Sequence, residues 1–194
     1  MHSIVPRALL ICLLAPAAAG LAQDPPPAAA AAPPANPFTA HSKAMYGGVQ
    51  KILLRTAENM PEENYSFKPT ETVRSFGQIV GHVADANYIF CSIAQGDKRP
   101  ASKIEETKTS KADLVAALKD AFAYCNKAYD GMTDASATQM VKLMGNDTPK
   151  LGALNVNSVH TIEHYGNLVT YMRLKNLVPP TSDPEFMKSL MPKK

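Results

Sequence analysis

Apolar residues recur at helical spacing in four segments of this 194-residue chain. The first segment, residues 39–59, carries one apolar stripe, formed by Met45, Val49, Ile52 and Leu53. Because residues three and four apart share one face of an α-helix, the stripe predicts an amphipathic helix with one buried side. Pro61 ends this helix, since proline lacks the backbone N–H that a continuing helix requires.

The second segment has both a start signal and a stop signal. Ser75, followed three residues later by Gln78, predicts a capping box at its beginning. Gly96 is a suitable residue for the left-handed backbone at its end. Its apolar positions are Phe76, Ile79, Val80, Val83, Ala86, Phe90 and Ile93.

The third and fourth segments follow the same rules. Ser110 begins the third and Gly131 ends it, and its buried face comprises Leu114, Leu118, Ala121, Phe122, Cys125 and Tyr129. The fourth spans residues 151–175 and stops before Pro179. Its apolar bulk comes from Leu151, Leu154, Ile162, Leu168, Val169 and Met172.

Four amphipathic helices without a convincing strand pattern predict an all-α four-helix bundle. We assign residues 38–178 to this bundle and residues 179–194 to a C-terminal tail. Residues 60–74 and 132–150 are longer connections, which would permit neighbouring helices to run parallel but do not determine the topology.

The N-terminal residues have the composition of a targeting segment. Residues 1–22 combine a basic start, a short apolar run and small residues, as a secretory signal peptide does, with cleavage expected after Ala19 or Ala22. The apolar run is shorter than the roughly 20 residues of a spanning helix, so we expect no membrane attachment after cleavage. Residues 23–37 are rich in proline and alanine and predict a stiff linker.

Charge and cysteine content narrow the functional classes. A formal net charge of +3 without a dense basic stripe argues against nucleic-acid binding. We expect a secreted or periplasmic bacterial protein after the signal peptide is cleaved. Cys91 and Cys125 would remain after cleavage, and either a disulfide or two buried thiols is consistent with the sequence.

The histidines are the candidate metal-binding residues. His160 and His164 lie four apart and therefore project from one face of the fourth helix, although this spacing alone is more typical of packing or solvent exposure than of metal binding. His82 lies within the apolar face of the second helix, where an imidazole needs a hydrogen-bond or metal partner. His41 is expected to be an exposed first-turn residue. Three inward histidines predict a metal site with an open coordination position.

Two stretches resemble a known family. "NYSFKPTETVRSFGQIVGHVADAN" and "HYGNLVTYMRLKNLVPP", together with the lone His82 and the HxxxH of the fourth helix, are similar to the DinB/YfiT-like family of metal-associated proteins. The resemblance covers about residues 40–182. It implies an up-up-down-down bundle, often dimeric, and a zinc or nickel ion held by His82, His160 and His164.

The resemblance leaves the reaction open. We expect metal-assisted hydrolysis or group transfer on an unidentified small molecule, and the alternative is a non-catalytic metal-binding or scaffold bundle. Asp85 and Glu163 are candidates to orient a histidine ligand or are solvated charges. Tyr165 and Tyr171 either pack in the core or contact a ligand. Asn167 stands where many family members have glutamine.

Overall fold

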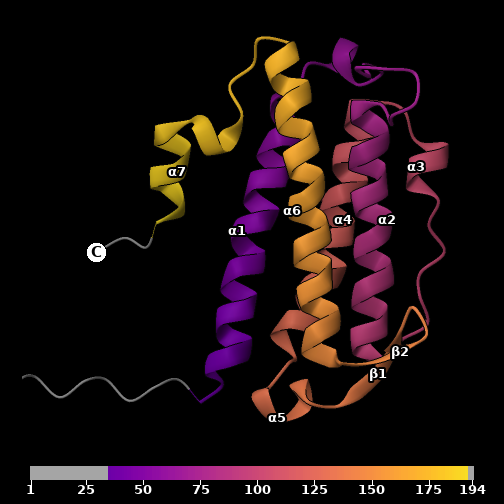
Figure 1. Ribbon diagram of the computed structural model, residues 1–194, viewed down its shortest axis with the longest axis vertical. Coiled ribbons are helices and arrows are strands. Elements are labelled where there is room, and N and C mark those ends of the chain that lie inside the picture. Colours follow the sequence, from indigo (N-terminus) through magenta and orange to yellow (C-terminus); the bar gives the residue numbers. More distant parts are fainter. Residues whose placement is uncertain (1–34, 192–194) are drawn as a thin grey trace, which may run out of the picture. The chain divides into compact units, whose positions relative to one another are not determined.

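The computed structural model describes residues 35–191, in which four long helices form the bundle (Figure 1). They are α1 (Pro37–Asn59), α2 (Phe76–Gln95), α4 (Lys111–Asp130) and α6 (Lys150–Leu174). The predicted all-α bundle is therefore confirmed. The predicted signal peptide lies outside the described residues, as does the predicted linker up to residue 34, whereas Pro37 already begins α1. No helix among residues 35–191 has the length and apolar character needed to cross a membrane.

The predicted helix signals act as expected. The Ser75 hydroxyl accepts from the backbone N–H of Gln78 at 3.2 Å, and the Gln78 side chain accepts from the Ser75 N–H at 2.8 Å, which completes the capping box. Gly96 ends α2 with a φ of 76°, in the left-handed region that glycine adopts without steric cost. The Ser110 hydroxyl accepts from the backbone N–H of Asp113 at 3.1 Å and so caps α4, without the reciprocal bond of a capping box.

The helices form two parallel pairs, α1 with α6 and α2 with α4. Ser42 of α1 bonds to Asn155 near the start of α6, and Cys91 of α2 lies beside Cys125 of α4. In chain order the directions are up, down, down, up, which differs from the expected up-up-down-down order (Figure 1). The reason is that residues 96–110, which carry α3 (Ile104–Thr107), return along the bundle so that α4 begins beside the start of α2.

The two longer connections therefore join antiparallel helices. Residues 60–75 contain the short helix η1 (Glu62–Asn64). The other connection contains α5 (Asp134–Ala137) and a hairpin of β1 (Met140–Leu143) and β2 (Asn146–Pro149), which the sequence pattern did not predict. Four-residue strands are too short to show a clear alternation of apolar and polar residues. The predicted tail contains η2 (Pro180–Ser182) and α7 (Pro184–Leu190).

A disulfide joins the parallel helices α2 and α4. Cys91 and Cys125 are both fully buried, with Cα atoms 5.3 Å apart. Of the two alternatives that the sequence left open, the structure has the disulfide. It closes a loop of 34 residues, for which the loss of chain entropy in the unfolded state corresponds to about 4 kcal/mol of stabilisation.

A buried cluster of polar side chains connects α1, α2 and α6. The Asn87 side-chain oxygen accepts from the Tyr46 hydroxyl at 2.7 Å and from the Asn157 amide at 3.1 Å. Its own amide donates to the Val83 carbonyl at 2.8 Å. Asn87 and Asn157 are 0% exposed, so a shift of one helix along another would leave these groups unpaired away from water.

Replacing Asn87 with alanine should lower the free energy of unfolding by about 2–4 kcal/mol, because two buried donors lose their acceptor. Urea unfolding measures this change. Asn126→Ala is the matched control, since Asn126 is exposed on α4, and it should change the stability by no more than about 0.7 kcal/mol. Equal stability of the two variants would contradict a structural role for the buried cluster.

Candidate metal centre

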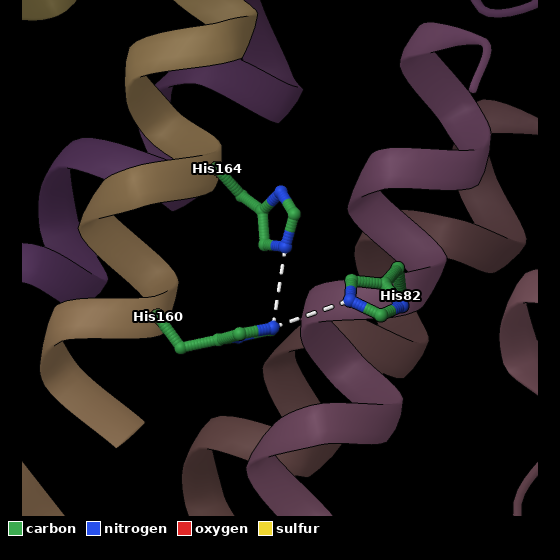
Figure 2. Close-up of side chains that lie close together, drawn as sticks. All are labelled: His82, His160 and His164. Atoms are coloured by element: carbon green, nitrogen blue, oxygen red, sulfur yellow. Dashed lines mark hydrogen bonds between the residues drawn. The ribbon is translucent and has the colours of Figure 1, made fainter. Parts of the chain in front are cut away.

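Three imidazole rings converge between α2 and α6 (Figure 2). The Nε2 atom of His160 lies 3.2 Å from Nε2 of His82 and 3.2 Å from Nε2 of His164. Within the described residues, these side chains form a cluster whose possible ligand atoms all lie within 4.8 Å of one another. The structure thus brings together all three histidines that the sequence singled out, whereas His41 is exposed on α1 as expected.

The spacing of the nitrogens suits a single metal ion. Two nitrogens bound to one tetrahedral ion at about 2.0–2.1 Å lie roughly 3.3 Å apart. The observed separations of 3.2 Å are close to this value. Imidazole nitrogen is a ligand for zinc and nickel alike, and three protein ligands leave a position for a further molecule.

Helix geometry and the buried polar cluster together position the rings. His160 and His164 lie on adjacent turns of α6, so their side chains project from the same face of the helix. Asn157, one turn before His160, bonds to Asn87 on α2 at 3.1 Å. This bond fixes the position of α2 along the antiparallel α6. His82 therefore lies beside His160 and His164.

Glu105 orients His82 and was missed by the sequence analysis. Its Oε2 atom lies 2.9 Å from Nδ1 of His82, while its Oε1 atom accepts from Nε of Arg74 at 2.7 Å. A proton on Nδ1, donated to this carboxylate, leaves the Nε2 lone pair directed at the cluster. Glu105 belongs to the four-residue helix α3, and no spacing rule relates it to His82, so the sequence offered no signal for this pair.

Asp85 matches neither of the two roles that the sequence left open, a histidine-orienting group or a solvated charge. Its carboxylate accepts from the backbone N–H groups of Ile104 and Glu105 at 3.1 and 3.0 Å, and thus caps α3 instead of contacting a histidine. Gly81 permits the close approach of α3, because a Cβ there would lie 2.8 Å from the Glu105 Cα. Asp85 therefore holds Glu105 beside His82, and Gly81 leaves the space that α3 needs there.

The remaining candidates differ in whether they contact a histidine of the cluster. Glu163 is exposed and, within the described residues, makes no hydrogen bond to the three rings. The Asn167 amide lies 3.4 Å from Nδ1 of His164, so this position does contact a candidate ligand. Tyr165 is buried and its hydroxyl pairs with Thr181, as expected for core packing. Tyr171 lines a cleft beside the histidines, and its hydroxyl donates to the Arg74 carbonyl at 2.7 Å.

A cleft of about 800 Å³ opens beside the histidines, and His164 and Glu105 form part of its wall. Most of its other lining side chains are polar or charged. They come from the connection before α2, from the first turn of α2 and from the second half of α6, and include Lys68, Glu71, Thr72, Arg74, Gln78, Asn167 and Thr170. A small molecule in this cleft would contact the histidine cluster at His164.

Burial keeps the α6 histidines neutral. It lowers the pKa of His160 to about 4, with further contributions from the neighbouring His164, His82 and Arg74. Burial also lowers the pKa of His164, as does the nearby His82. Nδ1 of His160 is buried and, among the described residues, has no hydrogen-bond partner that would stabilise a protonated ring. Neutral imidazole is the form that binds a metal ion.

The low pKa of His160 predicts that the metal-free protein loses stability as the pH falls. Between pH 6.5 and about 4 the unfolded chain binds a proton at this position that the folded chain does not, so stability decreases across this interval. Urea unfolding of chelator-treated protein at pH 7 and pH 5 measures the loss. His160→Gln should reduce it, whereas the exposed-site control His41→Gln should not. An undiminished loss in His160→Gln would disprove the assignment.

The chain is similar to known proteins in both sequence and fold. YjoA of Bacillus subtilis strain 168, an uncharacterised protein, is 29% identical over 122 residues, which cover 60% of this chain and 77% of that protein. A DinB-like protein from Bacillus cereus ATCC 10987 superposes with a TM-score of 0.62 at 18% identity, over 74% of this chain and 94% of that one. The YjoA crystal structure gives a TM-score of 0.58 at 23% identity, over 70% and 92%.

The family comparison covers the site itself. The model of the DinB superfamily matches residues 46–168, a range that contains the three clustered histidines and most of the bundle. The two solved structures support the same fold. The match extends over more than half of the chain, and the protein therefore belongs to the DinB superfamily.

Proposed function

We propose that this protein is a metal-dependent enzyme that binds one divalent ion, zinc or nickel, through His82, His160 and His164. Its reaction is hydrolysis or group transfer on a small molecule. The observation that carries this proposal is the cleft of about 800 Å³ that has His164 in its wall. An enzyme needs such access to its metal, whereas a scaffold protein does not.

The residues around the cluster are suited to this role. Glu105 fixes the tautomer of His82, and burial keeps His160 in its neutral form. Three neutral ligands leave the full positive charge of an ion available to a substrate. A bound divalent ion supplies Lewis acidity and lowers the pKa of a water ligand to about 7. Asn167 and the polar wall of the cleft provide groups that can orient a small molecule beside His164.

The non-catalytic alternative does not require that a small molecule can reach the metal ion. A scaffold bundle that retained the three histidines would gain stability from the ion, but it would need no path to it. In this protein the side of the cluster at His164 adjoins a cleft with polar walls. Catalysis is therefore the better supported of the two functions.

Elemental analysis tests the metal site. Purified protein, incubated with zinc or nickel and then desalted, should retain about one ion per chain. His160→Ala should abolish retention, and Glu105→Gln should weaken affinity about 10–100-fold, because the carboxylate no longer supports His82. His41→Ala is the control and should bind like the wild type. A wild-type protein that retains neither metal would refute the proposal.

We also propose that the protein is exported. The composition of residues 1–22 and the buried Cys91–Cys125 disulfide support this location, because disulfides persist in oxidising compartments. When the full chain is produced in a Gram-negative host, mass spectrometry of the periplasmic fraction should find a new N-terminus at Gly20 or Gln23. Recovery of only the intact chain in the cytoplasm would contradict export.

A further inference from the structure

We propose that the cleft beside the three histidines selects substrates that carry a carboxylate or another oxyanion, and that Arg74 and Lys68 bind this group. The inference rests on the proposed function, because it assumes that the reacting part of the substrate meets the metal centre. It adds a substrate class and two binding residues outside the histidine cluster.

Arg74 presents donors to the cleft that the protein leaves unused. Its Nε atom donates to Glu105 at 2.7 Å, but within residues 35–191 neither of its Nη atoms makes a hydrogen bond. Its side chain is 45% exposed and lines the cleft. A guanidinium group binds oxyanions through two parallel N–H groups, and the free edge of Arg74 offers this arrangement.

The position of Arg74 is determined by the surrounding structure. The Tyr171 hydroxyl donates to its backbone carbonyl at 2.7 Å, and the next residue, Ser75, is the cap of α2. Glu105 holds the side chain from the other side. A donor already held in its binding geometry loses less conformational entropy when a ligand arrives.

Lys68 supplies a second cation in the same cleft. It pairs with Glu71 at 2.7 Å, but the Glu71 side chain is 90% exposed. Ion pairs in water contribute little to stability, so an incoming anion can compete for the ammonium group. Lys68 is thus able to support an oxyanion bound at Arg74.

With a metal ion bound, the charge of the site favours an anion. Its charged side chains, apart from histidine, are Lys68 and Arg74 against Glu71 and Glu105, which sum to zero. Both oxygens of Glu105 already have partners, His82 and Arg74. A divalent ion on the histidines would bring the site to a net charge of +2, which attracts anionic ligands.

The backbone at the start of α2 cannot replace these side chains. A helix N-terminus often binds anions through its free N–H groups. Here the N–H groups of the capping residue and of the first three helical residues all have partners within the protein. The bonds run from Ser75 to Gln78 Oε1, from Phe76 to the Phe67 carbonyl, from Gly77 to the Tyr65 carbonyl and from Gln78 to the Ser75 hydroxyl.

The arrangement also limits the size of the substrate. Glu105 contacts Arg74 with one oxygen and Nδ1 of His82 with the other, so one carboxylate and one imidazole ring separate the guanidinium from the metal-facing Nε2. A ligand that reaches both therefore needs only a few bonds between its oxyanion and its reacting atom. The class is a small organic acid or a similarly compact oxyanion.

Two hydroxamates of equal chain length test the inference. Butyrohydroxamic acid ends in a methyl group, whereas the monohydroxamate of succinic acid ends in a carboxylate, and both bind metal through the hydroxamate. Cobalt-substituted protein reports binding through its visible spectrum. The ratio of the two dissociation constants is measured in each variant, so a change at the metal itself cancels. The wild type should prefer the carboxylate ligand about tenfold.

Arg74→Gln should reduce this preference to near unity, and Lys68→Gln should reduce it in part. Arg55→Gln is the matched control, since Arg55 lies on α1 beside Phe186 and outside the cleft, and should retain the wild-type ratio. Equal affinities in the wild type, or a preference that survives in the Arg74→Gln/Lys68→Gln double variant, would overturn the inference. If neither hydroxamate alters the cobalt spectrum, the proposed metal function fails instead.

Discussion

The bundle depends on one buried side chain, the carboxamide of Asn87, which bonds to α1 through Tyr46 and to α6 through Asn157. Apolar packing between helices tolerates sliding, because dispersion and burial are not directional. Hydrogen bonds in a core without water are directional, and sliding of one helix along another breaks them. A slip of one helical turn, about 5.4 Å, would separate His82 from the α6 pair, since the nitrogens now lie 3.2 Å apart.

The connection between α2 and α4 makes the two helices parallel and also supplies Glu105 to the candidate metal centre. Two parallel helices require a segment that returns along the bundle, and residues 96–110 provide it. This segment carries α3, which Asp85 caps and which Gly81 allows to approach α2 closely. The result is a carboxylate on His82 that no residue of the four long helices supplies. The topology and the candidate metal centre are therefore linked through Glu105.

The site combines neutral ligands with a nearby guanidinium, in a cleft whose charged side chains sum to zero before a metal ion binds. Burial and neighbouring positive charge lower the pKa of His160, while Arg74 faces the adjoining cleft and shares Glu105 with His82. The guanidinium disfavours protonation of the rings, and a divalent ion bound to them would give the site the positive charge that attracts anions. The same feature thus prepares the histidines for a metal ion and defines the substrates that we infer. The buried disulfide joins α2 to α4 and supports the export that we propose.

Local sequence rules determined the four long helices, their caps and the three histidine candidates, because apolar periodicity and the (i, i+4) spacing act within one helix. Tertiary structure alone decided the order of helix directions, the pairing of Cys91 with Cys125 and the role of Asp85. It also placed Glu105 on His82 and Arg74 beside the cleft. These contacts join residues that are far apart in the chain, so they exist only once helix packing has brought the segments together.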